Sequence, residues 1–329
     1  MLKLKNMQKE NQNYVIGVDG GGTKTIAALA DLGGEVLALG KSGSSSPRNV
    51  GIRKAIGNVA LAIKHILRNK KNIEITSTFI GLPATAEEFS LEKKEIEREF
   101  FSQKEIAEVF EGKVKIGSDQ EVAFRSGTNK KDGVLLIAGT GCVAHGWRGK
   151  KEVHASGWGW LADEGSAFWV GQRAFQAALK ELDRRGPKTL ITKIIFQNFK
   201  VKNIENLLIR IHSQNPTEVI PRFSIFCDEA SKKKDKIAQE IMKEAGKELA
   251  NSAKTVIKKL NFKKEIFPIV LVGGMFGSKV VLETVKNEIK KFAPKAKFIQ
   301  PKVDPVIGAI KLAIENLPSS REISLLGLD

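Results

Sequence analysis

A run of three glycines near the N-terminus is the segment of this sequence best suited to hold a phosphate group. Gly20-Gly21-Gly22-Thr23-Lys24 follows Tyr14-Val-Ile-Gly-Val-Asp19, which has the composition of a short buried strand. Glycines let backbone N–H groups converge on an anion with no Cβ in the way. Asp19 could hold Mg²⁺ directly or through water, because hard cations prefer carboxylate and phosphate oxygens. An ordinary glycine-rich hairpin turn explains the run equally well.

Two further glycine turns follow apolar strands later in the chain. Ala138-Gly139-Thr140-Gly141-Cys142 lies between an apolar strand and a returning strand, which is the context of the first run. If the two turns face each other, they can clamp one phosphate chain. Gly273-Gly274-Met275-Phe276-Gly277 opens a helix, where it would let a base or ribose approach the backbone or simply make a strand-to-helix turn. The conjunction of the three turns predicts a nucleotide site.

The order of the segments excludes two common nucleotide-binding motifs. A P-loop needs G-x-x-x-x-G-K-[ST], and Gly40-Lys41-Ser42 has Glu35 where the first glycine must be. A dinucleotide fingerprint lies between a strand and a helix, whereas the first glycine run precedes the strand-like Thr25–Ala30. We therefore expect neither a P-loop NTPase nor a Rossmann dehydrogenase.

The elements around these turns predict an α/β chain that repeats its first half. A meander of three strands, a helix, and then alternating strands and helices give the order βββαβαβα, with elements at 14–19, 25–30, 36–40, 52–68, 77–80, 91–110, 114–116 and after 119. A strand from Gly133 into a glycine turn, with a return strand to Trp147, then echoes the start. Helical patterns fill 167–264, and a strand, helix, strand and helix follow at 267–272, 279–292, 297–299 and 304–315. Two α/β halves around a cleft fit this order.

Composition narrows the function classes. The chain has 329 residues, 42% of them hydrophobic and 28% charged, as in globular proteins of about two domains. Two cysteines, Cys142 and Cys227, make no secreted disulfide framework, so we expect a cytoplasmic protein. No apolar run approaches the ~20 residues of a membrane helix, and we expect no membrane partner.

A formal net charge of +17 raises the question of nucleic acid. The basic residues are mostly lysines that alternate with glutamates, and the chain has only one tyrosine and four tryptophans. Specific base recognition favours arginine forks and aromatic platforms. We therefore expect no specific nucleic-acid partner.

The ordered motifs resemble a known family. They are Val18-Asp-Gly-Gly-Gly-Thr-Lys-Thr25, Gly117-Ser-Asp119, Ile137-Ala-Gly-Thr-Gly141, Ser156-Gly-Trp-Gly159, Asp163-Glu-Gly-Ser166 and Val272-Gly-Gly274. This set resembles the N-acetylglucosamine kinase-like group of the BadF/BadG/BcrA/BcrD ATPase family, in the actin, Hsp70 and sugar-kinase superfamily. The resemblance runs from about Tyr14 to Asn316.

The resemblance implies two ribonuclease-H-like, actin-like ATPase domains around a nucleotide cleft. They would span residues 14–130 and 131–303, the second with a helical insert at about 167–264. Residues 1–13 would be a flexible leader. Residues 304–329 would form a closing helix that packs back on the first domain, followed by a tail.

The resemblance also implies roles for individual residues around ATP and Mg²⁺. Gly21, Gly22, Thr23 and Lys24 would form the first phosphate loop, Gly139, Thr140 and Gly141 the second, and Gly273 and Gly274 the adenosine site. Asp119 would be the catalytic base, because a hydroxyl that attacks a γ-phosphoryl group must be oriented and lose its proton. Without the resemblance, the residues favour a helix N-cap at Asp119, which is compatible with catalysis.

The sugar side of the expected site is less regular. Ser156, Gly157, Trp158 and Asp163 match the family's sugar-binding stretch, and we expect Asp163 rather than Glu164 to reach the sugar, because adjacent residues do not share a helix face. These two acids could instead cap the helix that follows. Three tryptophans could stack on a sugar or fill the core, and we favour the core for each: Trp158, Trp160 and Trp169.

Three departures from the family pattern lie on this acceptor side. Ala162 stands where a glycine is frequent, and Cys142 stands where the usual motif has serine. Ser46-Pro47-Arg48-Asn49 replaces a loop often written with Asn-Pro or Asn-His. We expect Ser46, Asn49 and Cys142 to contact the acceptor, and the identity of the sugar is less determined than ATP binding.

The expected function is an ATP- and Mg²⁺-dependent kinase, acting as a homodimer, that phosphorylates N-acetylglucosamine or a related amino sugar at C6. One alternative is an ATPase activator of a dehydratase, which would need a cysteine-held iron–sulfur cluster. Another is a sugar or nucleotide sensor without turnover. Cys142-x-x-His145 with His154 does not predict a metal site, because residues three apart on a strand lie on opposite faces.

Overall fold

The computed structural model describes residues 12–68, 70, 73–83, 90–102 and 113–317. The chain divides into two compact units. The first unit comprises Met1–Asn129 and Lys302–Asp329, and the second comprises Lys130–Pro301. Within the described ranges, no helix has both the length and the apolar character needed to cross a membrane.

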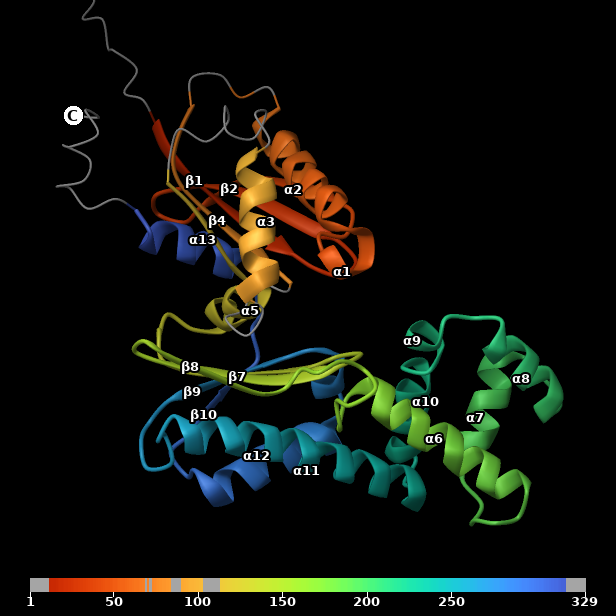
Figure 1. The fold of residues 1–329 in the computed structure, drawn as a ribbon. Helices are drawn as coiled ribbons and strands as arrows, with labels where there is room; N and C mark the ends of the chain where they lie inside the picture. The colour runs from red at the N-terminus through yellow and green to blue at the C-terminus, as the bar shows by residue number, and fades with distance from the viewer. Residues whose placement is uncertain (1–11, 69, 71–72, 84–89, 103–112, 318–329) are drawn as a thin grey trace, which may run out of the picture. The chain divides into compact units, whose positions relative to one another are not determined.

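The first unit contains a five-stranded mixed sheet in the order β3-β2-β1-β4-β5. Strands β1, β2 and β4 are labelled in Figure 1. Its strands are β1 (Gln12–Gly20), β2 (Thr25–Asp31), β3 (Val36–Ser42), β4 (Ile73–Leu82) and β5 (Lys113–Ser118). The first three strands form the predicted antiparallel meander, and β4 and β5 run parallel to β1. The carboxyl ends of β1, β4 and β5 therefore lie at one edge of the sheet.

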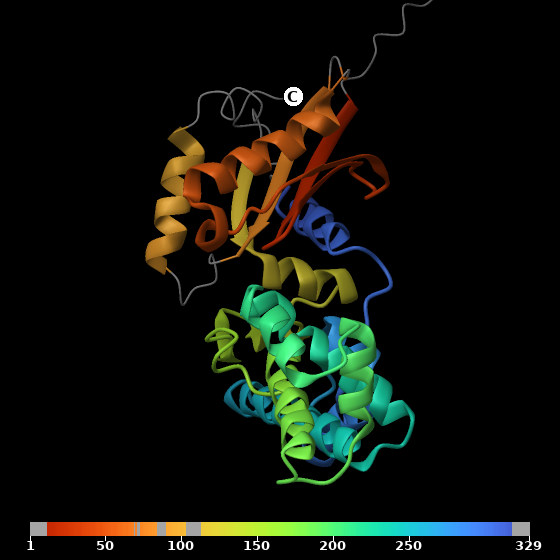
Figure 2. The ribbon, with the colours of Figure 1, turned by 90° about the vertical axis from the view of Figure 1, so that its right-hand side faces the viewer.

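Helices cover both faces of this sheet, which explains why β1 and β2 read as nearly continuous apolar runs. The helices are α1 (Pro47–Val50), α2 (Ile52–Leu67), α3 (Ser90–Ser102), α5 (Asp119–Gly127) and α13 (Val306–Glu315). Ile16 and Val18 pack on the α2 side, whereas Val15 packs against α13 on the other side. Figure 2 shows α2 and α13 on opposite faces. The predicted helix 91–110 is observed to Ser102, and its remainder lies outside the described residues.

The second unit repeats this topology, as the echo of the first hairpin predicted. Its sheet has the order β10-β9-β6-β7-β8, in which β6, β7 and β8 form the meander and β9 and β10 run parallel to β6. The strands are β6 (Gly133–Ala138), β7 (Cys142–Arg148), β8 (Lys151–Ser156), β9 (Pro268–Val272) and β10 (Lys297–Ile299). Strand β8 was not predicted, because it is short and largely polar and makes the half-buried edge of the sheet.

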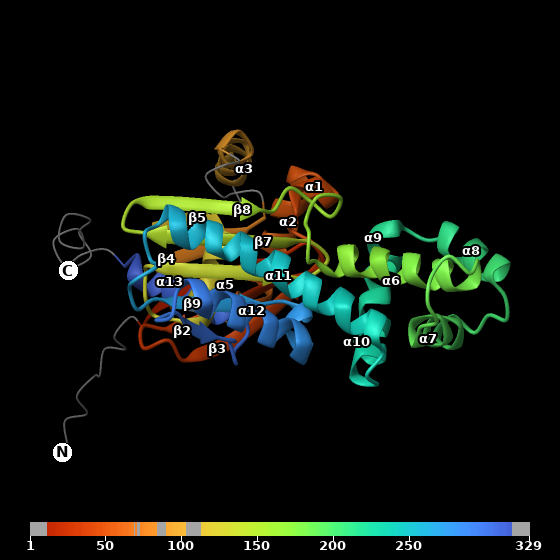
Figure 3. The same ribbon diagram turned by 90° about the horizontal axis from the view of Figure 1, so that it is seen from below.

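The helical insert of the second unit is present, and it is built from amphipathic helices. They are α6 (Ala167–Leu182), α7 (Leu190–Phe199), α8 (Ile204–His212), α9 (Pro216–Val219), α10 (Arg222–Lys232) and α11 (Lys236–Lys259). Figure 3 shows α6 to α10 grouped beyond one end of the sheet, while α11 lies along it beside α12 (Lys279–Phe292). One continuous apolar core joins the sheet to the helices of the insert, including α11. The α/β class and the insert are thus confirmed.

Candidate functional site

The first glycine turn closes at the carboxyl end of β1. The N–H of Gly21 donates to the carbonyl of Lys24 at 3.0 Å, and Gly20 and Thr25 pair in the ladder between β1 and β2. Gly22, Thr23 and Lys24 are exposed. The turn therefore presents open backbone at the sheet edge where ligands bind in α/β proteins.

The carbonyl groups of this turn are held from one side by a single segment, residues 44–49, which we call the serine segment. The N–H of Ser45 donates to the carbonyl of Gly21 at 3.1 Å, and the Ser44 hydroxyl donates to the same oxygen at 3.4 Å. The side-chain amide of Asn49 donates to the carbonyl of Gly22 at 3.0 Å. In a trans peptide the C=O and the following N–H point in opposite directions. The N–H groups of Gly22 and Thr23 are thus directed away from the serine segment.

The second glycine turn is built on the same principle in the second unit. The N–H of Gly139 donates to the carbonyl of Gly141 at 2.9 Å. The carbonyls of Gly139 and Thr140 accept the N–H groups of Ala167 and Phe168, at 2.8 and 3.3 Å. These donors are first-turn amides of α6, which lack partners within their own helix. The N–H groups of Thr140 and Gly141 consequently point away from α6.

Asp163 joins the second turn to the predicted sugar stretch. Its carboxylate accepts the N–H of Cys142 at 3.1 Å on one oxygen, and those of Gly157 and Trp158, both at 3.0 Å, on the other. Burial raises the pKa of Asp163, and the hydrogen bonds from these backbone groups oppose that shift. A Cβ on Gly141 would lie 2.6 Å from the carboxylate, so glycine is required there.

The alternative role of Asp163 and Glu164 as helix caps is wrong. The N-cap of α6 is Ser166, whose hydroxyl accepts the N–H of Trp169 at 3.2 Å. Asp163 instead organises the loop before the helix. Its direct contact with a sugar stays a prediction, and the bonds that the structure shows already use both carboxylate oxygens.

The loop from Ser156 to Trp160 places one tryptophan outside the core. Trp158 is 71% exposed, which corrects the expectation that it fills the core. Trp169, by contrast, is partly buried and packs against the core. The ring of Trp158 lies edge-on to His154, 5.5 Å between centroids. Ser156 is held by a 2.7 Å hydroxyl contact with Ser252 of α11. The exposed ring is thus available for stacking on a ligand.

Cys142 offers its backbone rather than its sulfur to this site. The thiol is buried, donates to the carbonyl of Glu164 at 3.2 Å and packs within the core. Burial raises its pKa to about 12, and the charge of Asp163 acts in the same direction. His145, three residues on, stacks on Trp147 and pairs with Glu152 at 2.7 Å, away from that core.

Asp19 ends β1 beside the first glycine turn. Burial raises the pKa of its carboxyl group to about 6; Lys24 lowers it and the negative charge of Asp304 raises it. A partly buried carboxylate at the end of a strand is the kind of oxygen ligand that a hard divalent cation takes. Sequence reasoning missed Asp304, whose position before α13 carries no signal of proximity to β1.

Asp119 lies at the same sheet edge as Asp19. Asp19 pairs with Gly81 of β4, and Gly81 pairs with Gly117 of β5, so two strand spacings, about 10 Å, separate the strands that carry the two acids. The N-cap of α5 is Ser118, whose hydroxyl accepts the N–H of Glu121 at 3.0 Å. Asp119 is the first helical residue, and its predicted capping role is therefore wrong. The carboxylate, half-buried, is not needed as a cap.

The third glycine turn packs against the second. Val272 of β9 pairs with Ile137 of β6, so both turns follow neighbouring parallel strands. Gly273 has φ +115°, and a Cβ there would lie 2.2 Å from the carbonyl oxygen of Ala138. Gly274 begins a 3-10 helix, Gly274–Gly277, with open space where its side chain would be. A ligand can therefore approach the Gly274 backbone closely.

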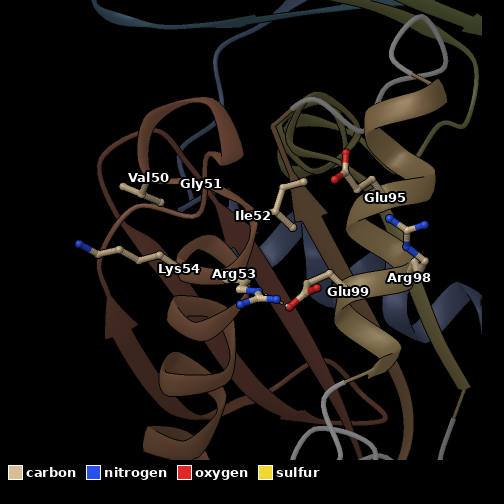
Figure 4. A pocket seen from close by; sticks show the side chains of 8 residues that line it. All are labelled: Val50, Gly51, Ile52, Arg53, Lys54, Glu95, Arg98 and Glu99. Carbon is tan, nitrogen blue, oxygen red and sulfur yellow. Dashed lines mark ion pairs between the residues drawn. The ribbon is translucent and has the colours of Figure 1, made fainter.

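A hollow of about 650 Å³ lies between the start of α2 and α3, apart from these turns. Figure 4 shows its lining, in which Arg53 is directed toward Glu99, 3.7 Å away. Its other charged residues are Lys54, Glu95 and Arg98. None of the lining residues was predicted for the site, and opposite charges face each other across it.

Comparison with known proteins identifies the family. Residues 16–313 match the BadF/BadG/BcrA/BcrD ATPase family. The chain belongs to this family. Two relatives match nearly all of it: N-acetylmuramic acid/N-acetylglucosamine kinase of Clostridium acetobutylicum, 30% identical over 91% of this chain and 98% of that protein, and N-acetyl-D-glucosamine kinase of Dictyostelium discoideum, 30% identical over 93% and 99%.

Solved structures agree with the architecture of this BadF/BadG/BcrA/BcrD family member. A structural genomics target from Chromobacterium violaceum has a TM-score of 0.70 at 21% identity and covers 92% of this chain and 99% of its own. A ROK family glucokinase from Streptomyces griseus, crystallised with glucose and AMPPNP, has a TM-score of 0.54 at 13% identity, with 91% and 98% covered. These likenesses support the fold, namely two actin-like α/β units.

Proposed function

We propose that this protein is an ATP-dependent amino-sugar kinase that transfers the γ-phosphoryl group of ATP to the C6 hydroxyl of N-acetylglucosamine. The observation that carries the proposal is the pair of glycine turns, one in each unit, whose carbonyls are held back so that successive N–H groups are free to bind an anion. The kinase names of two relatives that match nearly the whole chain support the reaction.

In this proposal the three glycine turns bind different parts of ATP. Gly22, Thr23 and Lys24 bind phosphate oxygens from the first unit. Thr140 and Gly141 do so from the second unit, and Gly273 and Gly274 bind adenosine. When bound, Mg²⁺ neutralises charge on the phosphate oxygens, and Asp19 is the residue that would hold it, directly or through water.

Asp119, Ser46 and the loop Ser156–Trp158 act on the acceptor sugar in this proposal. Asp119 accepts the proton of the attacking hydroxyl as general base, which requires only a correctly oriented carboxylate. Ser46 and the loop Ser156–Trp158 bind the sugar, with the exposed ring of Trp158 against its apolar face. We place the reaction in the cytoplasm, where free cysteines stay reduced, and propose a homodimer, which light scattering tests.

The dehydratase-activator alternative is disfavoured by the cysteines. An iron–sulfur cluster is held by thiolates, and a cluster bridged by two chains needs them at a surface. Cys142 and Cys227 are 3% and 0% exposed, and burial raises the pKa of both thiols. They are core residues rather than cluster ligands.

The test is a panel of sugars assayed for ADP release with ATP and Mg²⁺. We expect N-acetylglucosamine to raise the rate of ADP release at least tenfold over the sugar-free rate. We also expect amino sugars to stimulate ADP release more than glucose does. If no sugar stimulates ADP release, the proposed kinase function is refuted. If sugar and nucleotide bind without ADP release, the protein is instead a sensor without turnover.

A further inference from the structure

The two glycine turns differ in what holds them. In the second unit the donors to the turn carbonyls are backbone amides of α6, which do not depend on any side chain. In the first unit the carbonyl of Gly22 is held by a side chain, the amide of Asn49. The orientation of the Thr23 N–H therefore depends on one residue type.

The serine segment that carries Asn49 is itself anchored on two sides. The Thr25 hydroxyl donates to the carbonyl of Gly43 at 2.8 Å, and the side-chain amide of Asn58, on α2, donates to the carbonyl of Ser44 at 2.6 Å. The N–H of Asn49 donates to the carbonyl of Ser46 at 3.0 Å. Asn49 thus projects from a fixed backbone, so its amide can impose an orientation on the turn.

We propose that Asn49 is a positioning residue that orients the first phosphate turn, rather than a ligand of the acceptor sugar. This inference rests on the proposed function. The peptide between Gly22 and Thr23 can adopt more orientations than it could beside another residue type, because Gly22 has no Cβ to restrict it. The 3.0 Å bond from Asn49 fixes its carbonyl, and hence the direction in which the Thr23 N–H meets a phosphate oxygen.

The placement of Asn49 gives the turn a link to the acceptor side. Ser46, three residues earlier in the same segment, is 6% exposed and accepts the Asn49 N–H on its carbonyl. Phosphate binding and acceptor binding share one short segment of backbone.

The experiment compares Asn49→Ala, which removes the donor without adding charge, with Asn49→Gln, which keeps a donor on a longer chain. Asn251→Ala, at an exposed position on α11, is the matched control. For each variant we would measure the affinity for Mg²⁺·ADP by calorimetry without sugar, the KM for ATP and for N-acetylglucosamine, kcat and Tm. A misplaced phosphate donor is expected to weaken ADP binding and kcat/KM for ATP about tenfold or more.

The proposal predicts that Asn49→Ala shows these losses with the sugar KM within about twofold of wild type, and that Asn49→Gln recovers part of them. A raised sugar KM with unchanged ADP affinity would overturn it, since Asn49 would then bind the acceptor. Unchanged constants throughout would overturn it as well. If Asn49→Ala does not fold, Asn49→Ser, which also lacks the amide donor to Gly22, is compared with Asn49→Gln in its place.

The positioning role of Asn49 and the proposed kinase function can be refuted separately. Loss of ADP affinity in Asn49→Ala, in a protein whose wild type phosphorylates no sugar, would refute the proposed function and leave the positioning role intact. Normal ADP affinity in that variant, with an active wild type, would refute only the positioning role.

Discussion

The carboxylate of Asp163 accepts the backbone N–H of Cys142, 21 residues earlier, at 3.1 Å. With its second oxygen on Gly157 and Trp158, Asp163 ties the second glycine turn, the proposed phosphate turn, to a proposed sugar loop through one buried side chain. The serine segment makes the corresponding link in the first unit. In both units the proposed acceptor and phosphate segments are joined by hydrogen bonds.

Asp163→Asn should therefore affect both substrates. The amide nitrogen of asparagine would face backbone N–H donors. We therefore expect the free energy of unfolding to fall by about 1–3 kcal/mol, and the KM for the sugar and the KM for ATP both to rise. Urea unfolding and steady-state kinetics measure this. Glu164→Gln, at the exposed neighbouring acid, is the control and should stay within about 0.5 kcal/mol. A higher sugar KM alone, at unchanged stability, would assign Asp163 to sugar binding only.

Sequence reasoning found the sheets and glycine turns because each depends on local pattern. Buried strands such as Val134–Ala138 are apolar throughout, and the turns that follow need glycine. It failed where tertiary contacts decide. Asp163 binds the backbone N–H of Trp158 while the Trp158 side chain stays exposed, and nothing in Ser156-Gly-Trp-Gly159 shows that arrangement. The cap of α5 shifted by one residue, because Ser118 and Asp119 are both good caps in sequence.

The same limit explains the site residues that were missed. Ser44 and Asn58 lie 14 residues apart and meet only because α2 packs back against β3. Ser46-Pro47-Arg48-Asn49 was predicted as a loop on the acceptor side, and its residue types do not show that it would hold the first glycine turn. Asp304 lies near Asp19 because the chain returns to the first unit at Lys302, far from Asp19 in the sequence.

The thiols should be unreactive in the native protein. With a pKa of about 12, about one Cys142 thiol in ten thousand is ionised at pH 8, and the sulfur is buried. We expect no rapidly reacting thiol with a chromogenic disulfide reagent in buffer and two in 6 M guanidinium. Cys142→Ser should give one in denaturant. A native thiol that reacts within seconds would show that this turn opens.

Asp19 should make stability depend on pH in the absence of divalent cations. Its folded pKa of about 6 lies above the ordinary 3.8, so the folded state binds the proton more tightly than the unfolded state. The stability that this proton confers is present below pH 4 and is lost as the pH rises through 6. Relative to Asp19→Asn, we expect wild type to lose on the order of 2 kcal/mol between pH 4 and 7.5 in urea unfolding with EDTA. Asp304→Asn should shift this loss to lower pH, and a constant difference across that range would contradict the argument.

Gly273→Ala and Gly274→Ala should separate packing from ligand binding. A Cβ at Gly273 would meet the Ala138 carbonyl at 2.2 Å in a backbone conformation that alanine rarely adopts, so we expect a loss of about 3 kcal/mol or more. A Cβ at Gly274 meets nothing, so Tm should stay near wild type while ATP affinity falls if adenosine lies there. Equal Tm losses in the two variants would contradict this division, and thermal unfolding with calorimetric ATP titration measures both.

The most direct test of the account is the identity of the product formed from ATP and N-acetylglucosamine. Mass spectrometry and phosphorus NMR on the reaction of wild type and of Asp119→Asn would show it. We predict N-acetylglucosamine 6-phosphate in amounts equal to the ADP formed by wild type, and at least a hundredfold less from Asp119→Asn at nearly unchanged ADP affinity. Inorganic phosphate as the main product of wild type, or wild-type turnover by Asp119→Asn, would contradict the account.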